Sequence, residues 1–361
     1  MSALVLHEFH AARGAQFIEV SGCEAVSAYT SAEAEYEALT HRAAIIDLSF
    51  RGRVCLLGAD REKFLHGQVT NDVQRLKVGE GCYAALVSAK GKIESDLLIY
   101  KLREEILLDF EPGLVERVCA RLNKYVIAED VQIVDVSAHY GLLCVCGPKA
   151  CAVIEGTSWN LKAPQGVLSW SGTPHEAGDI YVMYNPRFGV PGYDLFVPNS
   201  VLQDLALSLE QSGRNMNAIW AGLDATETSR IENAVPLFGV DMSENTLPQE
   251  AEIQDRAISF AKGCYIGQEI IARIRTYGQV AKALRLLRFT TKSEHLPLPG
   301  TKLFAQGKEA GFVTSSAFSP KHGESVALAY VRKEHNSVGT TVEVGTAPSM
   351  SAEIVAIPAK F

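Results

Sequence analysis

The stretch Cys82–Tyr100, CYAALVSAKGKIESDLLIY, carries the pattern that decides the fold of its region. Two apolar runs, Cys82–Ser88 and Ile93–Tyr100, are separated by Ala89-Lys90-Gly91-Lys92. A glycine at the tip of so short a connection is typical of a β-hairpin. We therefore expect two antiparallel strands joined by this turn.

The segments on either side of the hairpin extend it into a larger unit. In Gly113–Val126 apolar residues recur every four positions, which indicates one buried face of a helix. The elements expected around the hairpin are the strand Arg53–Leu57, the helix Ala59–His66, the strand Glu105–Phe110, the helix Gly113–Val126 and the strand Val131–Val136. The order β-α-β-β-α-β with one extra strand resembles a split βαβ (ferredoxin-like) sandwich.

The last part of the chain has a different pattern. From Ala283 onward, six short apolar segments are separated by turn residues such as Ser319-Pro320-Lys321-His322-Gly323. Short, regularly spaced strands of this kind are typical of a small β-barrel or sandwich. This part, from Gly278, carries ten Lys and Arg against six Glu, whereas the rest carries 24 against 36 Asp and Glu, which favours a separate domain.

Composition limits the classes to which the chain can belong. It has 361 residues, of which 47% are hydrophobic and 21% charged, so it can bury several cores and is not a disordered chain. The net charge of −8 argues against a general role in coating nucleic acid. No apolar run has transmembrane length, and the first residues do not resemble a signal peptide. Eight scattered cysteines without a CxxC pair favour reduced, buried thiols in the cytoplasm and no metal site.

The most distinctive motif is Lys262-Gly263-Cys264-Tyr265-Ile266-Gly267-Gln268-Glu269. A helix beginning near Gly267 would direct N–H groups towards Cys264, and Lys262 would add a positive charge. Both effects favour a thiolate. On composition alone, a buried cysteine in a tight turn is the better explanation.

Other polar residues leave alternatives open. Asp96 lies in an apolar strand, where its carboxylate either reaches solvent or serves a ligand. Asn71-Asp72 fits a turn better than a site. Arg230-Ile231-Glu232, followed by Asp241, suits either an ion-pair network or a ligand with a polar heterocycle or a carboxylate.

The motif KGCYIGQE, with Arg273 downstream, resembles the signature of the YgfZ family of folate-binding proteins, which are relatives of the glycine-cleavage T-protein (aminomethyltransferase). The likeness extends over nearly the whole chain. Further matching segments are Phe64–Val73, Ala89–Tyr100, Arg187–Asp194, Arg230–Asp241, Gly311–Ser316 and Ala327–Val331.

This resemblance implies an α+β, three-lobed, T-protein-like architecture around tetrahydrofolate. It implies a discontinuous central folate-binding domain of residues 1–50 and 138–277, a ferredoxin-like domain of residues 51–137 and a C-terminal β-barrel domain of residues 278–361. The folate site would include Tyr83, Asp96, Arg187 and Arg230, and the chemistry would depend on Cys264, Lys262 and Asp96. Asp96 would lie near the reactive nitrogens of the folate.

Two departures from the T-protein pattern separate the possible functions. T-proteins have a Tyr-Thr-Gly-Glu-Asp-Gly loop whose Glu contacts the pterin, and Val190 stands in its place here. T-proteins also lack the motif cysteine, so Cys264 and Gln268 favour the YgfZ family.

The leading expectation is a tetrahydrofolate-binding accessory protein that acts in synthesis or repair of the iron–sulfur clusters of client enzymes, including tRNA-modifying ones. Its partners would be tetrahydrofolate or a one-carbon derivative and iron–sulfur client or assembly proteins, with no direct contact with nucleic acid or membrane. The alternative is a tetrahydrofolate-dependent aminomethyl or one-carbon transferase. A third possibility is a folate-sensing module without turnover.

Overall fold

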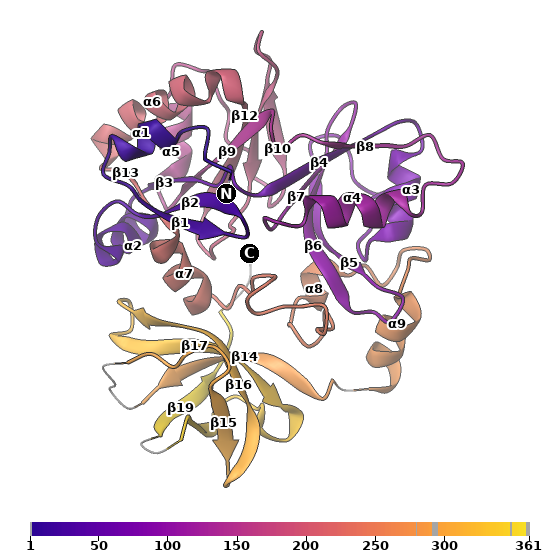
Figure 1. Cartoon of the computed structure of the whole chain (residues 1–361), viewed down its shortest axis with the longest axis vertical. Coiled ribbons are helices and arrows are strands. Elements are labelled where there is room, and N and C mark those ends of the chain that lie inside the picture. Colours follow the sequence, from indigo (N-terminus) through magenta and orange to yellow (C-terminus); the bar gives the residue numbers. More distant parts are fainter. Residues whose placement is uncertain (1, 279, 291–294, 347–348, 359–361) are drawn as a thin grey trace.

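The computed structural model describes residues 2–278, 280–290, 295–346 and 349–358. Three lobes meet around the middle of the molecule, and the N-terminus lies near their junction (Figure 1). The expected three-lobed α+β architecture is confirmed.

The first lobe is built on a six-stranded sheet. Its strands, in spatial order, are β10 (Trp170–Thr173), β11 (Ile180–Tyr184), β12 (Gly192–Pro198), β9 (Tyr140–Cys146), β3 (Ala44–Asp47) and β13 (Ile219–Trp220). One face packs against α1 (His7–Ala11), α5 (Ala150–Glu155) and α6 (Leu202–Gly213) through a hydrophobic core. The short 3₁₀ helices η1 (Asn199–Val201) and η2 (Arg214–Met216) flank α6.

A hairpin and two helices complete this lobe. The hairpin consists of β1 (Gln16–Val20) and β2 (Cys23–Ala28), and the helices α2 (Ala32–His41) and α7 (Leu223–Glu232) pack against each other. Helix α2 begins where Ser31 Oγ accepts a hydrogen bond from the Ala34 amide, as an N-cap does. Helix α7 also contacts the third lobe, so it joins the two bodies.

The second lobe contains the hairpin expected from Cys82–Tyr100. Its five-stranded antiparallel sheet has the order β5 (Gly81–Val87), β6 (Ile93–Lys101), β7 (Ile106–Phe110), β4 (Gly52–Leu57) and β8 (Gln132–Asp135). Helices α3 (Arg61–Gln68) and α4 (Val115–Asn123) cover one face, where Val118 and Leu122 are buried. The opposite face points towards the junction of the lobes and carries polar residues.

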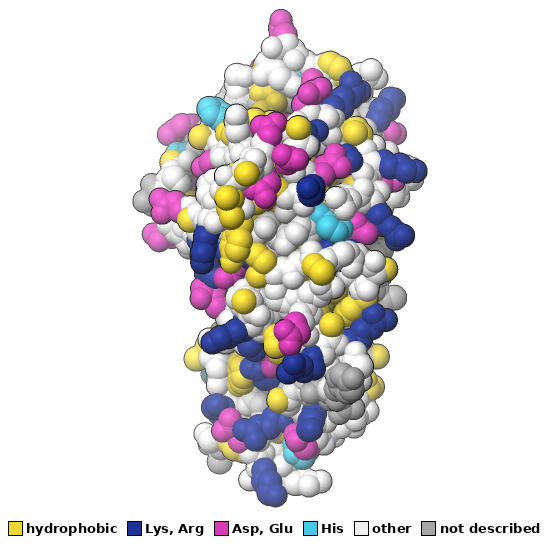
Figure 2. Space-filling view, turned by 90° about the vertical axis from the view of Figure 1, so that its right-hand side faces the viewer, with side chains coloured by type: hydrophobic (Ala, Val, Ile, Leu, Met, Phe, Trp, Pro, Cys, Tyr) yellow, Lys and Arg dark blue, Asp and Glu magenta, His cyan; other side chains and the backbone are white. Residues whose placement is uncertain are grey.

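The third lobe is a closed six-stranded barrel, as expected. Its strands, in spatial order, are β14 (Lys282–Phe289), β17 (Glu324–Arg332), β16 (Lys308–Ser319), β15 (Lys302–Ala305), β18 (Thr341–Val344) and β19 (Met350–Val355), with η3 (Lys333–His335) after β17. On the face seen in Figure 2, Lys and Arg side chains lie over both ends of the molecule, whereas Asp and Glu side chains are more frequent over the first two lobes than over this barrel.

The KGCYIGQE motif packs against the turn of the β5–β6 hairpin. It follows α8 (Gln254–Ala257), and its last two residues begin α9 (Gln268–Tyr277). Gly267 has a φ of +83°, and a Cβ added there would lie 2.4 Å from the Ser88 carbonyl oxygen. Only glycine meets both demands, so this residue allows α9 to begin directly beside the turn.

The predicted domain boundaries fall between these sheets, and the division into domains stays a prediction. Among the described residues, no helix is long and apolar enough to span a bilayer.

Candidate functional site

The polar face of the five-stranded sheet supplies the first part of the site. Leu98 on β6 lies opposite Tyr83 on β5 and opposite Asp109 on β7, so these three side chains share one face. Asp96, two residues before Leu98, points to the same face. Leu97 alternates to the other side, where it joins the core beneath the helices.

A pocket of about 290 Å³ lies over this polar face, where the first and second lobes meet. Such a volume is near the lower limit for small-molecule pockets, about 300–1,000 Å³, so it suits the head group of a larger ligand. The side chains and segments that line it include Arg51, Asn71, Tyr83, Asp96, Asp109, Glu111, 185–187, 235–237 and Arg256.

Asp96 has an unused hydrogen-bonding atom in this pocket. Its Oδ2 accepts a hydrogen bond of 2.8 Å from the Tyr83 hydroxyl, whereas its Oδ1 is buried and has no partner among the described residues. Burial, reinforced by the Glu111 carboxylate, raises the pKa of Asp96 to about 6. A group with this pKa can both accept and donate a proton near neutral pH.

Tyr83 connects Asp96 to a cation. The guanidinium carbon of Arg256 lies 5.1 Å from the centre of the Tyr83 ring. Burial raises the pKa of Tyr83 well above its usual value, so the phenol keeps its proton and remains a donor. Asn71 holds both neighbours, because its amide donates to the backbone carbonyls of Tyr83 and Arg256.

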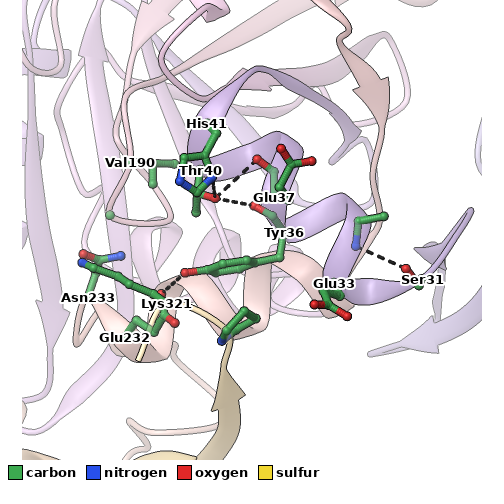
Figure 3. Close-up of a pocket in the computed structure, with 13 residues that line it drawn as sticks. Ser31, Glu33, Tyr36, Glu37, Thr40, His41, Val190, Glu232, Asn233 and Lys321 are labelled. Atoms are coloured by element: carbon green, nitrogen blue, oxygen red, sulfur yellow. Dashed lines mark hydrogen bonds between the residues drawn. The ribbon is translucent and has the colours of Figure 1, made fainter. Parts of the chain in front are cut away.

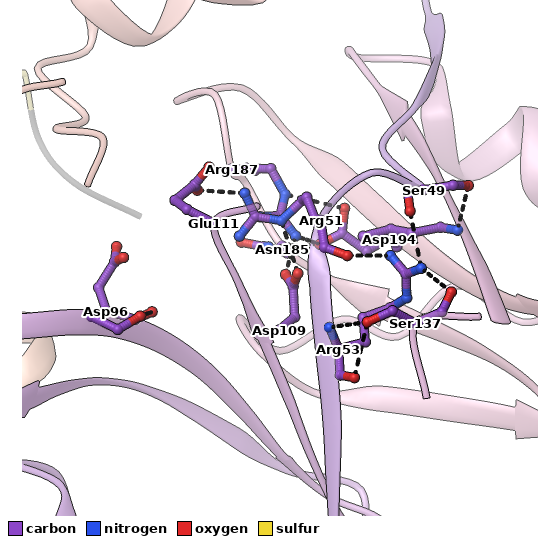
Figure 4. A network of polar contacts seen from close by, with 12 residues as sticks. Ser49, Arg51, Arg53, Asp96, Asp109, Glu111, Ser137, Asn185, Arg187 and Asp194 are labelled. Atoms are coloured by element: carbon purple, nitrogen blue, oxygen red, sulfur yellow. Dashed lines mark hydrogen bonds and ion pairs between the residues drawn. The ribbon is translucent and has the colours of Figure 1, made fainter. Parts of the chain in front are cut away.

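Asp109 is in the opposite situation. Its two oxygens accept hydrogen bonds from Arg51 at 2.8 Å and from Arg187 at 2.6 Å. Arg187 also pairs with Asp194, and Arg51 with Glu111. Burial alone would raise the pKa of Asp109, but the two guanidiniums outweigh it and hold the pKa below its usual value. Figure 4 shows Asp96 standing apart from this network.

Arg187 therefore lines the pocket as expected, with its charge already neutralised by two aspartates. Arg230, the other expected cofactor-binding arginine, does not line the pocket. It is buried and pairs with Asp241 at 2.7 Å and with Glu227, and its Nη1 donates to the Val235 carbonyl. Because residues 235–237 form one wall, Arg230 supports that wall from behind.

Lys262 is likewise committed to the backbone. Its ammonium donates to the carbonyl oxygens of His66, Val69 and Asn71, and burial lowers its pKa to about 8. All three donor hydrogens are used, so we assign Lys262 to holding the segment after α3 in place. The expected part of Lys262 in activating the Cys264 thiol is not supported by these contacts.

Cys264 lies outside the pocket, on the surface. Of the eight cysteines, all of which the structure describes, it is the exposed one. A Cβ added to the adjacent Gly263 would lie 3.8 Å from Nε2 of His66, so an imidazole is close to this backbone. Within the described part of the chain, no group of three or more His, Cys, Asp or Glu side chains is arranged to hold a metal ion.

A larger outer cavity, of about 730 Å³, lies between α2, the end of α7 and the barrel (Figure 3). Its most buried carboxylate, Glu232, already accepts hydrogen bonds from Tyr36 and Ser319. Val190 lines this outer cavity and not the pocket with Asp96. The absence of a glutamate at position 190 therefore removes no polar group from the Asp96 pocket.

The sequence pointed to Tyr83 and Asp96, and the structure brings these two together. The sequence analysis did not assign five other residues to the pocket: Arg51, Asn71, Asp109, Glu111 and Arg256. Asp109 had the same signal as Asp96, a carboxylate inside the apolar run Ile106–Phe110, and could have been found. Arg256 had none, because it lies in the short helix α8, which only the fold brings to the sheet.

The chain was compared with known proteins. Residues 6–262 match the GCVT N-terminal domain family, and residues 282–359 match the glycine cleavage T-protein C-terminal barrel domain. An aminomethyltransferase of Thermosipho melanesiensis is 31% identical over 98% of this chain and 95% of its own length. One of Rubrobacter xylanophilus is 30% identical over 98% of this chain and 92% of its own. The crystal structure of the glycine cleavage system aminomethyltransferase T from Bartonella henselae covers 99% of this chain and 97% of its own, with a TM-score of 0.89 and 23% identity.

Proposed function

We infer the function from one premise: the chain belongs to the glycine cleavage T-protein family. We propose that it is a tetrahydrofolate-dependent aminomethyl or one-carbon transferase of T-protein type. The curated relatives carry the name aminomethyltransferase, which favours this role over the iron–sulfur accessory role.

The single observation that carries the proposal is the state of Asp96. A buried carboxylate oxygen without a partner costs free energy in the absence of a ligand, and an N–H group of a bound heterocycle would satisfy it. Tetrahydrofolate has such N–H groups at its reactive nitrogens. The residues of the pocket therefore fit the ligand.

Tetrahydrofolate would supply the nitrogens that accept the one-carbon unit. Asp96 Oδ1 would accept a hydrogen bond from one of these N–H groups and hold its proton as the nitrogen reacts. The Tyr83 hydroxyl would keep the carboxylate oriented, because it donates to Oδ2. The paired guanidiniums of Arg51 and Arg187 would keep the opposite wall fixed.

The proposal is tested by transfer from an aminomethyl thioether to tetrahydrofolate, with release of the thiol and ammonia and formation of 5,10-methylenetetrahydrofolate. We expect the purified chain to catalyse it and Asp96→Asn to slow it by about 100-fold or more, because a proton-transfer group is lost. Cys264→Ser should retain transfer, because this thiol lies outside the pocket. No transfer by the wild-type chain would reject the proposal.

A second candidate is a YgfZ-type role in synthesis or repair of iron–sulfur clusters, favoured by the exposure of Cys264. The seven other cysteines are partly or fully buried, so brief treatment with limiting iodoacetamide should label Cys264 first. In a deletion strain, Cys264→Ser should then fail to restore the activity of iron–sulfur enzymes, whereas Cys55→Ser should restore it. Full rescue by Cys264→Ser would remove the thiol from this role.

A further inference from the structure

Arg256 is the pocket cation without a carboxylate partner among the described residues. Its side chain lines the pocket and lies over the Tyr83 ring, and its Nε is buried without a hydrogen-bond partner. The two other guanidiniums at this pocket, Arg51 and Arg187, are each paired with Asp109 and a second carboxylate. A charged group with an unused buried donor is a natural partner for an anion on the ligand.

The backbone that carries Arg256 is held firmly. Asn71 donates a hydrogen bond of 2.9 Å to the Arg256 carbonyl, and the Thr70 hydroxyl donates to the next carbonyl, that of Ala257. The Ser259 amide donates back to the Thr70 carbonyl. These three contacts fix the segment against the residues that follow α3, so the backbone that carries the guanidinium is held beside the pocket before a ligand binds.

One aromatic ring separates Arg256 from Asp96. The guanidinium lies over the Tyr83 ring, and the hydroxyl of that ring donates to Asp96. In folate, one aromatic ring, the p-aminobenzoyl group, likewise separates the reactive nitrogens from the glutamate. A folate with its nitrogens at Asp96 would therefore extend towards Arg256.

We propose that Arg256 binds a carboxylate of the glutamyl tail and makes the pocket selective for folates over pterins that lack this tail. The inference rests on the proposed function. An arginine suits the task because its planar fork donates two parallel hydrogen bonds to a carboxylate. The unpaired guanidinium then recognises the anionic end of the ligand, and Asp96 recognises the N–H groups of its head.

The test compares two ligands by calorimetry: tetrahydrofolate, and the amide of tetrahydropteroate, in which a neutral carboxamide replaces the glutamate. Arg256→Gln should weaken the binding of tetrahydrofolate by about 10- to 100-fold, because a charge-assisted hydrogen bond is lost, and the binding of the amide by less than about twofold. Arg256→Lys keeps the charge and should therefore lose less affinity for tetrahydrofolate than Arg256→Gln does. Arg275→Gln is the matched control, because Arg275 also stacks on a ring, that of Phe260, outside the pocket.

Each outcome is decisive. Equal losses for both ligands with Arg256→Gln would mean that Arg256 acts only by holding Tyr83, and would overturn this proposal while the folate function stands. Unchanged affinity for both ligands would overturn it too. If the wild-type chain binds neither ligand, the proposed function itself fails, and this inference with it.

Discussion

Asp96 and Asp109 lie on the same face of one sheet and line the same pocket, yet the protein treats them in opposite ways. Asp109 is fully paired with Arg51 and Arg187, and its pKa is lowered. Asp96 has one neutral partner and a buried unpaired oxygen, and its pKa is raised to about 6. The pocket thus has two sides. We call the side around Asp109 saturated, because its charged groups are paired, and the side around Asp96 unsaturated, because a buried hydrogen-bonding atom there has no partner.

This difference distinguishes residues that hold the lobes together from residues that remain available to a ligand. Arg187 belongs to the first lobe and Asp109 to the second, so the saturated side fixes the position of one lobe against the other. The unsaturated side, Asp96 with Tyr83 and Arg256, leaves hydrogen-bonding capacity for a ligand. Residues that hold a fold together satisfy one another, whereas residues kept for binding do not.

Removing the saturated carboxylate should have the largest effect on stability. Asp109→Ala leaves two buried guanidiniums without their shared partner and should lower the free energy of unfolding by about 3–5 kcal/mol. Urea denaturation measures it. Glu309→Ala, which breaks the exposed pair with Lys302, is the control and should cost less than about 1 kcal/mol. Equal losses in the two variants would mean that Asp109 does not hold the lobes together.

Neutralising the unsaturated carboxylate, Asp96, should raise the free energy of unfolding instead of lowering it. Because the pKa of Asp96 is higher in the folded chain than in the unfolded chain, its ionisation costs stability as pH rises from about 4 to 6. Asp96→Asn should therefore stabilise the protein at pH 7.5. The full shift in the pKa of Asp96 corresponds to a gain in stability of about 3 kcal/mol. We expect about 1–2 kcal/mol because the residue is not completely buried, and less at pH 5. A loss of stability at pH 7.5 would show that Asp96 has a stabilising partner besides Tyr83 in the apo protein.

The smallest effect should come from Tyr83→Phe. The phenol donates to the ionised carboxylate and so lowers the pKa of Asp96 against burial. Without it, the pKa of Asp96 should rise further, by up to about one unit, as measured by carbon-13 NMR of the Asp96 carboxyl group. Tyr125→Phe, on the far side of the sheet, should leave the titration unchanged. A fall in the pKa would contradict the assigned direction of this hydrogen bond.

The sequence predicted much of the fold but less than half of the pocket residues, for a physical reason. Strands such as Ile93–Tyr100 have a local periodicity that burial imposes, and a carboxylate within such a strand is visible as an exception. Whether it is paired depends on residues from other lobes, as Arg187 demonstrates for Asp109. Arg230 matched a motif, yet its charge is used by Asp241.

The role of Lys262 stays a prediction, and its contacts depend on the fold in a similar way. Its closeness to Cys264 in sequence suggested an effect on the thiol, but the fold directs its ammonium to three carbonyls. Arg256 shows the reverse case, a residue without a local pattern that becomes part of the pocket because Asn71 holds its backbone against the sheet.

The most direct test of the central claim is calorimetric titration of tetrahydrofolate into the wild-type chain and into Asp96→Asn at pH 7.5. If the unpaired oxygen of Asp96 is the ligand's anchor, the wild-type chain binds and the variant binds more weakly by about 1–3 kcal/mol. This loss corresponds to about a 5- to 150-fold change in affinity. Equal affinities would remove Asp96 from the binding site and contradict the account of the unsaturated side.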